Sequence, residues 1–422
     1  MTPEIKQRIE QIKNGEIPKG YKHSKVGIIP EDWKVLRLKD KFDRLSRKNA
    51  EGNTNVLTIS AQYGLINQEE FFKKEIASDD KSNYYLLHRG EFAYNKSYSN
   101  GYPFGAIKRL SRYDKGVVSP LYICFSANPN NACPEYYEQY FEAGRLNHEI
   151  QAYAQEGARN HGLLNISVID FFNSKIIVPP IAEQKRIAKI LSAQDTVIEC
   201  YEKKIEQLKR MKKYYLQNMF PKRGETVPKI RFKGFTESWE QRKIGQISTF
   251  INGRAYSKSE LLPNGKYKVL RVGNFYTNDS WYYSDLELGE KYYANFGDLL
   301  YTWSTTFGPH LWLGDKVIYH YHIWKVDLSD QLEKHFAIQL LEQDKNNIMS
   351  GKNGSTMVHI TKEGMEQKEV IIPPDISEQA KIGTFFGRID NLITLHQRKL
   401  EEEKKKKKAL QQLLLTGIVR TN

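Results

Sequence analysis

"VPPIAEQKRIAKIL" at residues 178–191 and "IPPDISEQAKIGTFF" at residues 372–386 are two copies of one pattern: an apolar run, a proline pair and a helix start. A shift of 195 positions aligns their EQ pairs, and apolar residues stay in phase as far as Ile205 and Leu400. The shift places Glu183, Gln184, Ile187, Ile190, Ile198 and Ile205 on Glu378, Gln379, Ile382, Phe385, Ile393 and Leu400, respectively. An internal repeat of this kind sets the architecture of the whole chain.

The proline pairs indicate where strands end and helices begin. "SKIIV" and "KEVII" precede them, and proline neither continues a strand ladder nor lies inside a helix. Ser377 is the expected N-cap of the second helix. Apolar residues then recur at steps of three, four or seven, which predicts two helices of roughly 35–40 residues, about 55 Å long. Such long amphipathic helices are typical of a coiled-coil seam.

The repeat also extends upstream of the two helices. "PEDWKVLRL" resembles "TESWEQRKIG", which aligns Trp33 with Trp239, and "RGEFAYNKS" resembles "FGDLLYTWS", which aligns Tyr94 with Tyr301. Short β-branched and aromatic strands alternate with helical patches, so each block is of the α+β class. The predicted organisation is a first block (1–180), a central helix with its linker (181–224), a second block (225–376) and a C-terminal helix (377–422).

Composition restricts the class of protein. The 422 residues are 40% hydrophobic and carry a net charge of +14, which favours an anionic partner such as nucleic acid. The second block is an exception, with 18 Lys and Arg against 19 Asp and Glu. No apolar run approaches the roughly 20 residues of a membrane span, and the polar stretch "MTPEIKQRIEQIKNGE" at residues 1–16 lacks the apolar core of a secretory signal. We therefore expect a cytoplasmic protein without membrane contact. Cys124, Cys133 and Cys200 have no metal or disulfide spacing.

Motifs for catalysis are missing from the sequence. It contains no phosphate-binding glycine loop, no dinucleotide fingerprint, no zinc-protease motif and no hydrolase elbow, and no methyltransferase or nuclease core is recognisable. His320 and His322 in "YHYHIW" share one face of a strand, but no third ligand accompanies them. We therefore predict neither a catalytic residue nor a metal site.

Polar and aromatic loops in the two blocks are the remaining candidates for function. Lys and Arg can bind phosphate or guanine, Asn can bind adenine, and aromatic side chains can stack. The candidate DNA-binding residues are Lys96, Tyr98, Asn100, Tyr102, Lys108 and Arg109 in the first block, and Arg254, Lys258, Trp303, Thr305, His310, Lys352 and Asn353 in the second. These loops lie where the two copies diverge, so one scaffold carries two different surfaces.

The whole arrangement resembles the specificity subunit of Type I restriction-modification systems. The proline-to-EQ helix starts, the tryptophan phrases and the two divergent blocks carry this resemblance. It implies two target-recognition domains that each read one half of a bipartite site in double-stranded DNA. It also implies that the two long helices pack antiparallel as a spacer and dock two modification subunits, with the aligned residues 183–205 and 378–400 named above as docking candidates.

By the same resemblance, the chain performs no chemistry. Modification subunits supply S-adenosylmethionine, and restriction subunits, which are motor nucleases, use ATP and magnesium, so no cofactor is expected in this chain. One alternative is a structural coiled-coil adaptor whose blocks bind proteins. A second alternative, a stand-alone methyltransferase or nuclease, would require motifs that the sequence lacks.

Overall fold

The computed structural model describes residues 2–60, 63–72, 80–99, 101–153, 155–156, 164–222, 224–276, 278–304, 306–350 and 361–421, with side chains of 155–156 and 346–350 left out. The chain forms two compact units. Unit 1 comprises Met1–Tyr201 and Lys399–Asn422, and unit 2 comprises Glu202–Arg398. Each unit therefore contains one block and a segment of each long helix.

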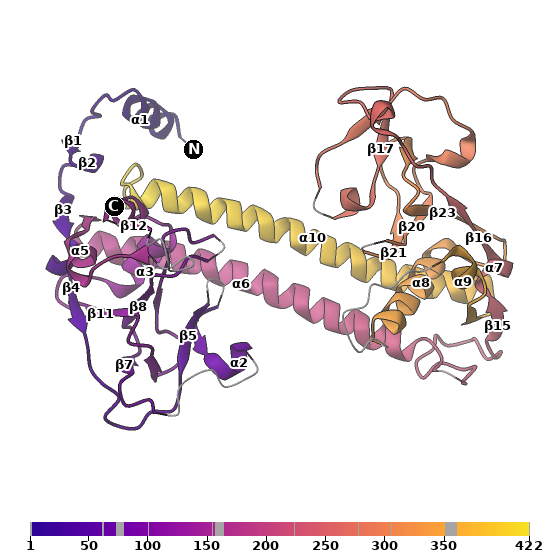
Figure 1. Cartoon of the computed structure of the whole chain (residues 1–422), viewed down its shortest axis with the longest axis horizontal. Helices are drawn as coiled ribbons and strands as arrows, with labels where there is room; N and C mark the ends of the chain where they lie inside the picture. The colour runs from indigo at the N-terminus through magenta and orange to yellow at the C-terminus, as the bar shows by residue number, and fades with distance from the viewer. Residues whose placement is uncertain are drawn as a thin grey trace. The chain divides into compact units, whose positions relative to one another are not determined.

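The two long helices are confirmed. Helix α6 spans Ile181–Asn218 and helix α10 spans Ile376–Leu415 (pink and yellow in Figure 1). Asp375 rather than the predicted Ser377 caps α10, since its Oδ1 accepts the backbone N–H of Ser377 at 2.7 Å. The carboxylate reaches the second free N–H of the helix, which is the usual capping geometry.

The helices run antiparallel within each unit. In unit 1, Gln194 of α6 donates to Glu403 of α10 at 2.5 Å, and Lys407 lies 2.5 Å from Asp195. In unit 2, Lys212 binds Asp390 at 2.7 Å. Further along, the rings of Tyr215 and Phe385 meet at 4.9 Å, edge to face. In unit 2 the partners thus retreat along α10, from Asp390 to Phe385, as α6 advances from Lys212 to Tyr215. In unit 1, Ile187 near the start of α6 shares a core with Leu414 at the end of α10, which is the order that an antiparallel coiled coil requires.

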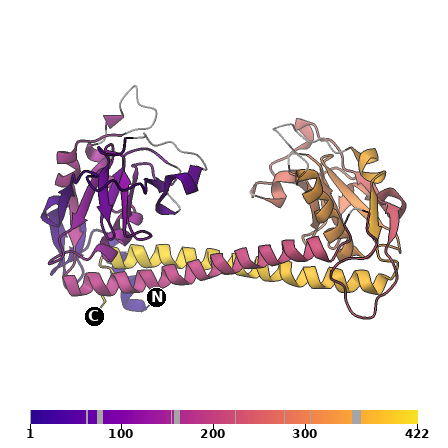
Figure 2. The ribbon, with the colours of Figure 1, turned by 90° about the horizontal axis from the view of Figure 1, so that it is seen from below.

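The first block is a mixture of short strands and helices that lies against the beginning of α6 (Figure 2). The block begins with α1 (Pro3–Lys13) and a hairpin of β1 (Tyr21–Ser24) and β2 (Gly27–Pro30). Its elements are β3 (Lys34–Arg37), β4 (Phe42–Leu45), β5 (Leu57–Ser60), β6 (Gly64–Asn67), α2 (Gln68–Phe72), β7 (Tyr85–His88), β8 (Phe92–Asn95), β9 (Ala106–Arg109), β10 (Lys115–Val118), β11 (Ile123–Ala127), α3 (Pro134–Glu142), α4 (Asn147–Tyr153), β12 (Gln155–Glu156), β13 (Leu164–Asn165), α5 (Val168–Asn173) and β14 (Lys175–Val178).

The second block has a corresponding sequence of elements. These are β15 (Glu240–Lys243), α7 (Ile244–Ile247), β16 (Ser248–Asn252), β17 (Tyr267–Leu270), β18 (Tyr282–Ser284), β19 (Tyr293–Ala294), β20 (Leu299–Thr302), β21 (Gly308–Leu311), β22 (Val317–Tyr319), β23 (Ile323–Leu328), α8 (Lys334–Ser350), α9 (Lys362–Glu366) and β24 (Glu369–Ile372). Short 3-10 helices at Leu38–Asp40, Lys258–Glu260, Val272–Phe275 and Glu290–Tyr292 also occur within the two blocks.

The sheet topology repeats along with the sequence. The central sheet of the first block has the strand order β4-β11-β8-β9, and that of the second block has the order β16-β23-β20-β21. In both blocks the strand of the tryptophan phrase pairs antiparallel with the strand before the prolines, as β3 with β14 and β15 with β24. The internal repeat predicted from sequence is therefore a repeat of structure.

The far end of each long helix completes a hydrophobic core. Leu414 and Leu415, at the end of α10, lie in the core of unit 1 with Trp33. Met219 and Phe220, just after α6, lie in the core of unit 2, where Phe220 contacts Trp239 at 5.8 Å. Because the 195-residue shift aligns these two pairs, both units bury equivalent residues.

Candidate functional site

The repeated glutamine of each EQ phrase ties the helix start to its block. Gln184 donates to the carbonyl of Pro179 at 2.9 Å and accepts the backbone N–H of Cys133, before α3, at 2.9 Å. Gln379 donates to the carbonyl of Pro373 at 2.9 Å and accepts the backbone N–H of Glu333, before α8, at 2.8 Å. Buried polar groups of this kind need such partners, so the glutamines fix the angle at which each helix leaves its block.

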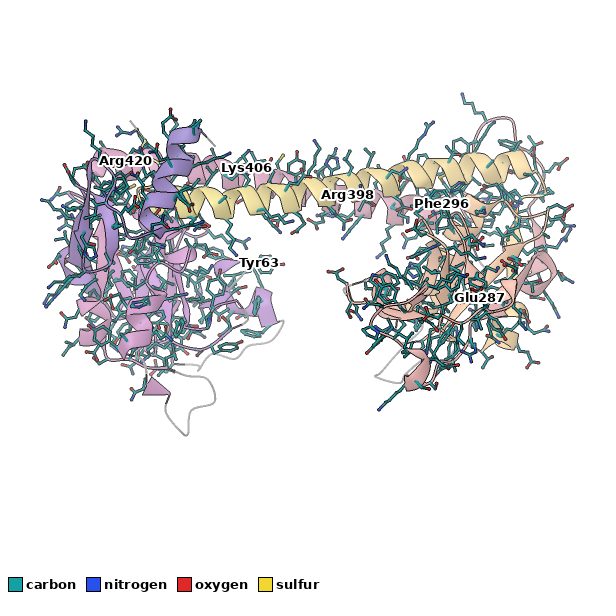
Figure 3. The ribbon with its side chains drawn as sticks, turned by 90° about the horizontal axis from the view of Figure 1, so that it is seen from above. Tyr63, Glu287, Phe296, Arg398, Lys406 and Arg420 are labelled. Carbon is teal, nitrogen blue, oxygen red and sulfur yellow. The ribbon has the colours of Figure 1, made fainter. Side chains whose placement is uncertain are left out.

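The repeated glutamate of each phrase binds an arginine. Glu183 is 2% exposed and receives Arg420 at 2.8 Å, from the segment that follows α10, together with the indole N–H of Trp33 at 2.9 Å. Arg420, in this C-terminal segment, is labelled in Figure 3. Glu378 is 1% exposed and receives both guanidinium nitrogens of Arg231, at 2.7 and 2.8 Å. Bonding to Glu183 and Glu378 raises the pKa of Arg420 and Arg231, respectively.

The docking candidates on the two long helices differ in how far their side chains are buried. Glu183, Gln184, Glu378 and Gln379 are buried, and so are the apolar residues Ile187, Ile198, Ile205, Ile382 and Leu400. Their side chains pack inside each unit, and their role as docking contacts stays a prediction. Phe385 and Ile393 are partly buried. Of the candidates, Ile190 is exposed, at 39%.

Exposed apolar residues that sequence reasoning missed lie about two to three helical turns beyond Ile190 and its counterpart Phe385. Val197 of α6 is 41% exposed, and Leu392 of α10, its counterpart in the repeat, is 44% exposed. Leu395 is 48% exposed. The signal was present in the sequence, because these residues are apolar in both copies. Periodicity alone could not show which apolar residues face the partner helix and which face solvent.

In the first block, the structure separates free candidates from internally paired ones. Tyr98 is 62% exposed, and Lys96 lies just after β8, partly exposed. Lys108 instead binds Glu142 of α3 at 2.5 Å and the hydroxyl of Tyr102 at 3.0 Å, and that hydroxyl donates to the same glutamate. Arg109 binds Glu135 and Glu138, each at 2.7 Å. Asn100 lies outside the described residues.

The cations of Lys108 and Arg109 therefore neutralise carboxylates of α3. Their side chains are 11% and 16% exposed. Contact with a phosphate would require each cation to exchange a close carboxylate for the ligand, and a partly buried glutamate would then lose its counter-charge. The two residues link β9 to α3, and Lys96 and Tyr98 are better placed to meet a ligand.

The candidates of the second block lie around the end of its central sheet. Arg254 binds Glu260 at 2.6 Å and holds the pKa of that carboxyl low, at about 2, while Lys258 is exposed. The indole of Trp303 donates to the carbonyl of Tyr321 at 2.9 Å. Thr305, Lys352 and Asn353 lie outside the described residues.

His310 of β21 lies in an aromatic setting. Its ring stacks on Phe275 at 4.1 Å, and its Nε2 lies 3.2 Å from the hydroxyl of Tyr276 and 3.3 Å from that of Thr302. Burial, with nearby Lys345 adding to it, lowers the pKa of His310 to about 4. The imidazole is consequently neutral near pH 7 and offers one donor and one acceptor.

Within the described part of the chain, no group of three or more His, Cys, Asp or Glu residues is arranged to hold a metal ion. His320 and His322 are close, with ring centroids 5.0 Å apart, but they pack among aromatic rings. Among the described helices, none combines the length and apolar character that a membrane crossing needs.

These features define a class of protein: two α+β units with the same strand order in their central sheets, each with its own polar loop face and each completed by segments of two shared helices. The chain belongs to the Type I restriction modification DNA specificity domain family, which it matches over residues 30–210 and 236–404. It is a specificity subunit of that type, and the resemblance noted from its sequence is confirmed.

Two relatives from Methanocaldococcus jannaschii match over nearly their full lengths. One is a putative type I restriction enzyme MjaX specificity subunit, 26% identical over 427 residues, covering 95% of this chain and 96% of the relative. The other is the type I restriction enzyme MjaVIII specificity subunit, 26% identical over 430 residues, covering 93% and 94%.

Two solved structures share the fold. The S subunit of a Type I restriction-modification system from M. genitalium superposes with a TM-score of 0.56 at 14% identity, over 90% of this chain and 96% of the other. A chain from a study of assembly and conformational transition of the type I R-M system gives a TM-score of 0.54 at 14% identity, over 93% and 99%.

Proposed function

We propose that the two blocks of this chain each read one half of a bipartite, asymmetric target in double-stranded DNA. The repeated scaffold with two diverged loop faces is the observation that supports this most directly. The same sheet order recurs in both blocks, while the loops at equivalent positions carry different side chains, such as Lys96 after β8 and Trp303 after β20. Equivalent scaffolds with different faces suit two different half-sites.

The exposed residues of the long helices support docking of two copies of a modification subunit. Val197 and Leu392 are equivalent in the repeat and similarly exposed, at 41% and 44%. Exposed apolar side chains repeated in this way fit a partner that binds each unit in the same manner. We propose that Ile190 and Val197 contribute to one such surface, and Leu392 and Leu395 to the other.

In this proposal the chain itself carries out no catalysis and binds no cofactor. S-adenosylmethionine belongs to the modification subunits, and ATP and magnesium belong to the restriction subunits, which are motor nucleases. The complex acts in the cytoplasm. Since the second block has no excess of positive charge, its partners or a few local cations must supply much of the affinity for phosphate there.

Methylation mapping tests the proposal. The chain is co-expressed with its modification subunits, and methylated adenines are mapped by single-molecule sequencing in cells with and without the gene. We expect one bipartite motif that disappears when the gene is absent. The isolated chain, assayed with DNA and S-adenosylmethionine, should show no methylation. A complex that methylates without this chain, or with no sequence preference, would instead favour the structural adaptor.

A further inference from the structure

Four strand ends meet at one edge of the central sheet in the second block. Strands β16 and β20 end at this edge, and strands β21 and β23 begin there, since the pairs Asn252↔Trp324, Thr302↔Ile323 and Thr302↔Gly308 are antiparallel. The turn formed by His320, Tyr321 and His322 lies at the same edge, between β22 and β23. Loops that start from rigid strands at one edge form a stable platform for recognition.

The backbone fixes this turn from three sides. His320 donates its N–H to the carbonyl of Leu270 at 2.9 Å, and Tyr321 donates to the carbonyl of Arg254 at 3.0 Å. Trp303 donates to the carbonyl of His322 at 3.2 Å. A side chain at Gly253 would come within 2.4 Å of the carbonyl oxygen of His320, so the close approach of the two segments requires glycine.

Aromatic rings cover the turn. Trp303 lies 5.1 Å from the ring of His322, and Tyr256 stacks beside His320 at 6.4 Å. The side chain of Tyr321 is 39% exposed. Burial lowers the pKa of His320 to about 4 and also lowers that of His322. Both imidazoles are therefore neutral near pH 7, when each provides a donor and an acceptor rather than a charge.

A cation without an acidic partner completes the cluster. The guanidinium of Arg271, just after β17, lies 4.2 Å from the ring centre of Tyr282, and that ring is 41% exposed. The described residues give this guanidinium no ion pair, in contrast to Arg254, which binds Glu260. Stacking on a tyrosine orients the planar group and leaves its outer N–H groups for a ligand.

We propose that this edge, made of Arg271, Tyr282, Trp303 and the turn 320–322, is the base-reading surface of the second block for its half-site. The inference rests on the proposed function and specifies where recognition occurs. Such a surface explains how a block without net positive charge can bind DNA. One oriented arginine and two neutral imidazoles read base edges by hydrogen bonds, and the aromatic rings pack against the bases. Arg271 is the residue suited to a bidentate contact with guanine.

The test uses the full chain assembled with its modification subunits and a duplex that carries the mapped site. Arg271→Ala and Tyr321→Ala should each lower affinity for this duplex by about 10- to 100-fold, the effect of losing one good base contact. They should also reduce the preference for the native second half-site over a scrambled one. Preference at the first half-site should not change.

Arg271→Lys separates base reading from phosphate binding. Lysine keeps the charge but lacks the planar fork, so discrimination should be lost as in Arg271→Ala if the contact is to a base. If Arg271→Lys keeps wild-type discrimination, Arg271 contacts phosphate and the proposal is overturned. Full discrimination in both Arg271→Ala and Tyr321→Ala would overturn it as well.

Matched controls come from the same block. Arg242→Ala removes an arginine of β15 that pairs with Glu240, and Phe296→Ala removes an aromatic ring, 73% exposed, from the turn before β20 at the opposite end of that strand (Figure 3). Both should bind like wild type. Hydrogen exchange of β17 and β23 confirms that each variant is folded. If Arg271→Ala unfolds, the proposal is tested with Arg271→Lys and Tyr321→Ala alone. A wild-type complex with no preferred site would refute the proposed function itself, independently of these variants.

Discussion

Arg420 binds the buried carboxylate of Glu183 at 2.8 Å, and it does in unit 1 what Arg231 does for Glu378 in unit 2. The two arginines reach their glutamates by different routes. Arg231 belongs to the linker that follows α6, whereas Arg420 belongs to the last residues of the chain. Tyr21 and Arg8 also hold this C-terminal segment, by donating to the carbonyls of Gly417 and Ile418, each at 2.6 Å. The C-terminal segment thus completes unit 1.

The first prediction concerns these two arginines. Removal of one leaves a buried carboxylate without its counter-charge, which typically costs about 3 kcal/mol. Arg420→Ala should therefore destabilise unit 1, and Arg231→Ala should destabilise unit 2. Hydrogen exchange, read peptide by peptide, assigns the loss to a unit. Arg210→Ala is the control, since its pair with Glu206 is exposed at 72% and 62% and should contribute little. Equal protection in all three variants would refute the role given to the pairs.

The second prediction concerns a half-length chain. A fragment with the first block and α6 should dimerise through α6 and, with modification subunits, direct methylation to a symmetric repeat of one half-site. Because Arg231 and Arg420 have equivalent roles, the length of the fragment should matter. A fragment of residues 1–235 contains Arg231, which can bind Glu183 of the second copy in the dimer, whereas a fragment of residues 1–223 lacks it. We expect the longer fragment to form the tighter dimer by sedimentation. A fragment that directs methylation only to the original asymmetric site would contradict the pseudo-symmetry.

A third prediction separates reading from structure in the first block. Tyr98→Ala should weaken recognition of one half-site without loss of stability, because its ring is 62% exposed. Lys108→Met should destabilise the link between β9 and α3, because Glu142 then loses its cation. Both quantities should be measured for both variants. Half-site discrimination should fall in Tyr98→Ala but not in Lys108→Met, and the free energy of unfolding should fall in Lys108→Met but not in Tyr98→Ala. Reduced discrimination together with normal stability in Lys108→Met would show that Lys108 contacts DNA after all.

The sequence was sufficient to predict the repeat, both long helices and the α+β class, because their signals are local or periodic. Strand ends marked by paired prolines and apolar steps of three and four residues do not depend on distant contacts. The site was harder to predict. Lys108 and Arg109 read as exposed cations in a basic loop, and only the fold brings the carboxylates of α3 to them.

Arg271 shows the opposite limit. It lies in a stretch with no nucleic-acid motif, and its significance depends on Tyr282 lying below it and on an absence of acidic partners among the described residues. This relationship comes from the antiparallel pairing of β17 with β18, in which Val269 lies opposite Tyr282, and sequence alone does not give that register. Glu183 and Glu378 show the same limit: the repeat marked them as important, but whether they face a partner or the interior depends on tertiary contacts.

The last prediction concerns pH. The pKa of His310 is lowered to about 4 in the folded chain, below its ordinary value of about 6.5, so the unfolded chain binds the proton more readily. Stability from the neutral ring is complete above pH 6.5 and is lost as pH falls toward 4. Protection of β20 and β21 from hydrogen exchange should therefore fall between pH 7 and pH 5, before carboxylates dominate. The asparagine in His310→Asn cannot be protonated, so protection of β20 and β21 should change less between pH 7 and pH 5 in this variant than in the wild type. Its protection at pH 7 should be lower, because stacking on Phe275 is lost. An equal fall in both proteins would assign the pH dependence to other groups, with His320 the first to examine, because its pKa is also lowered to about 4.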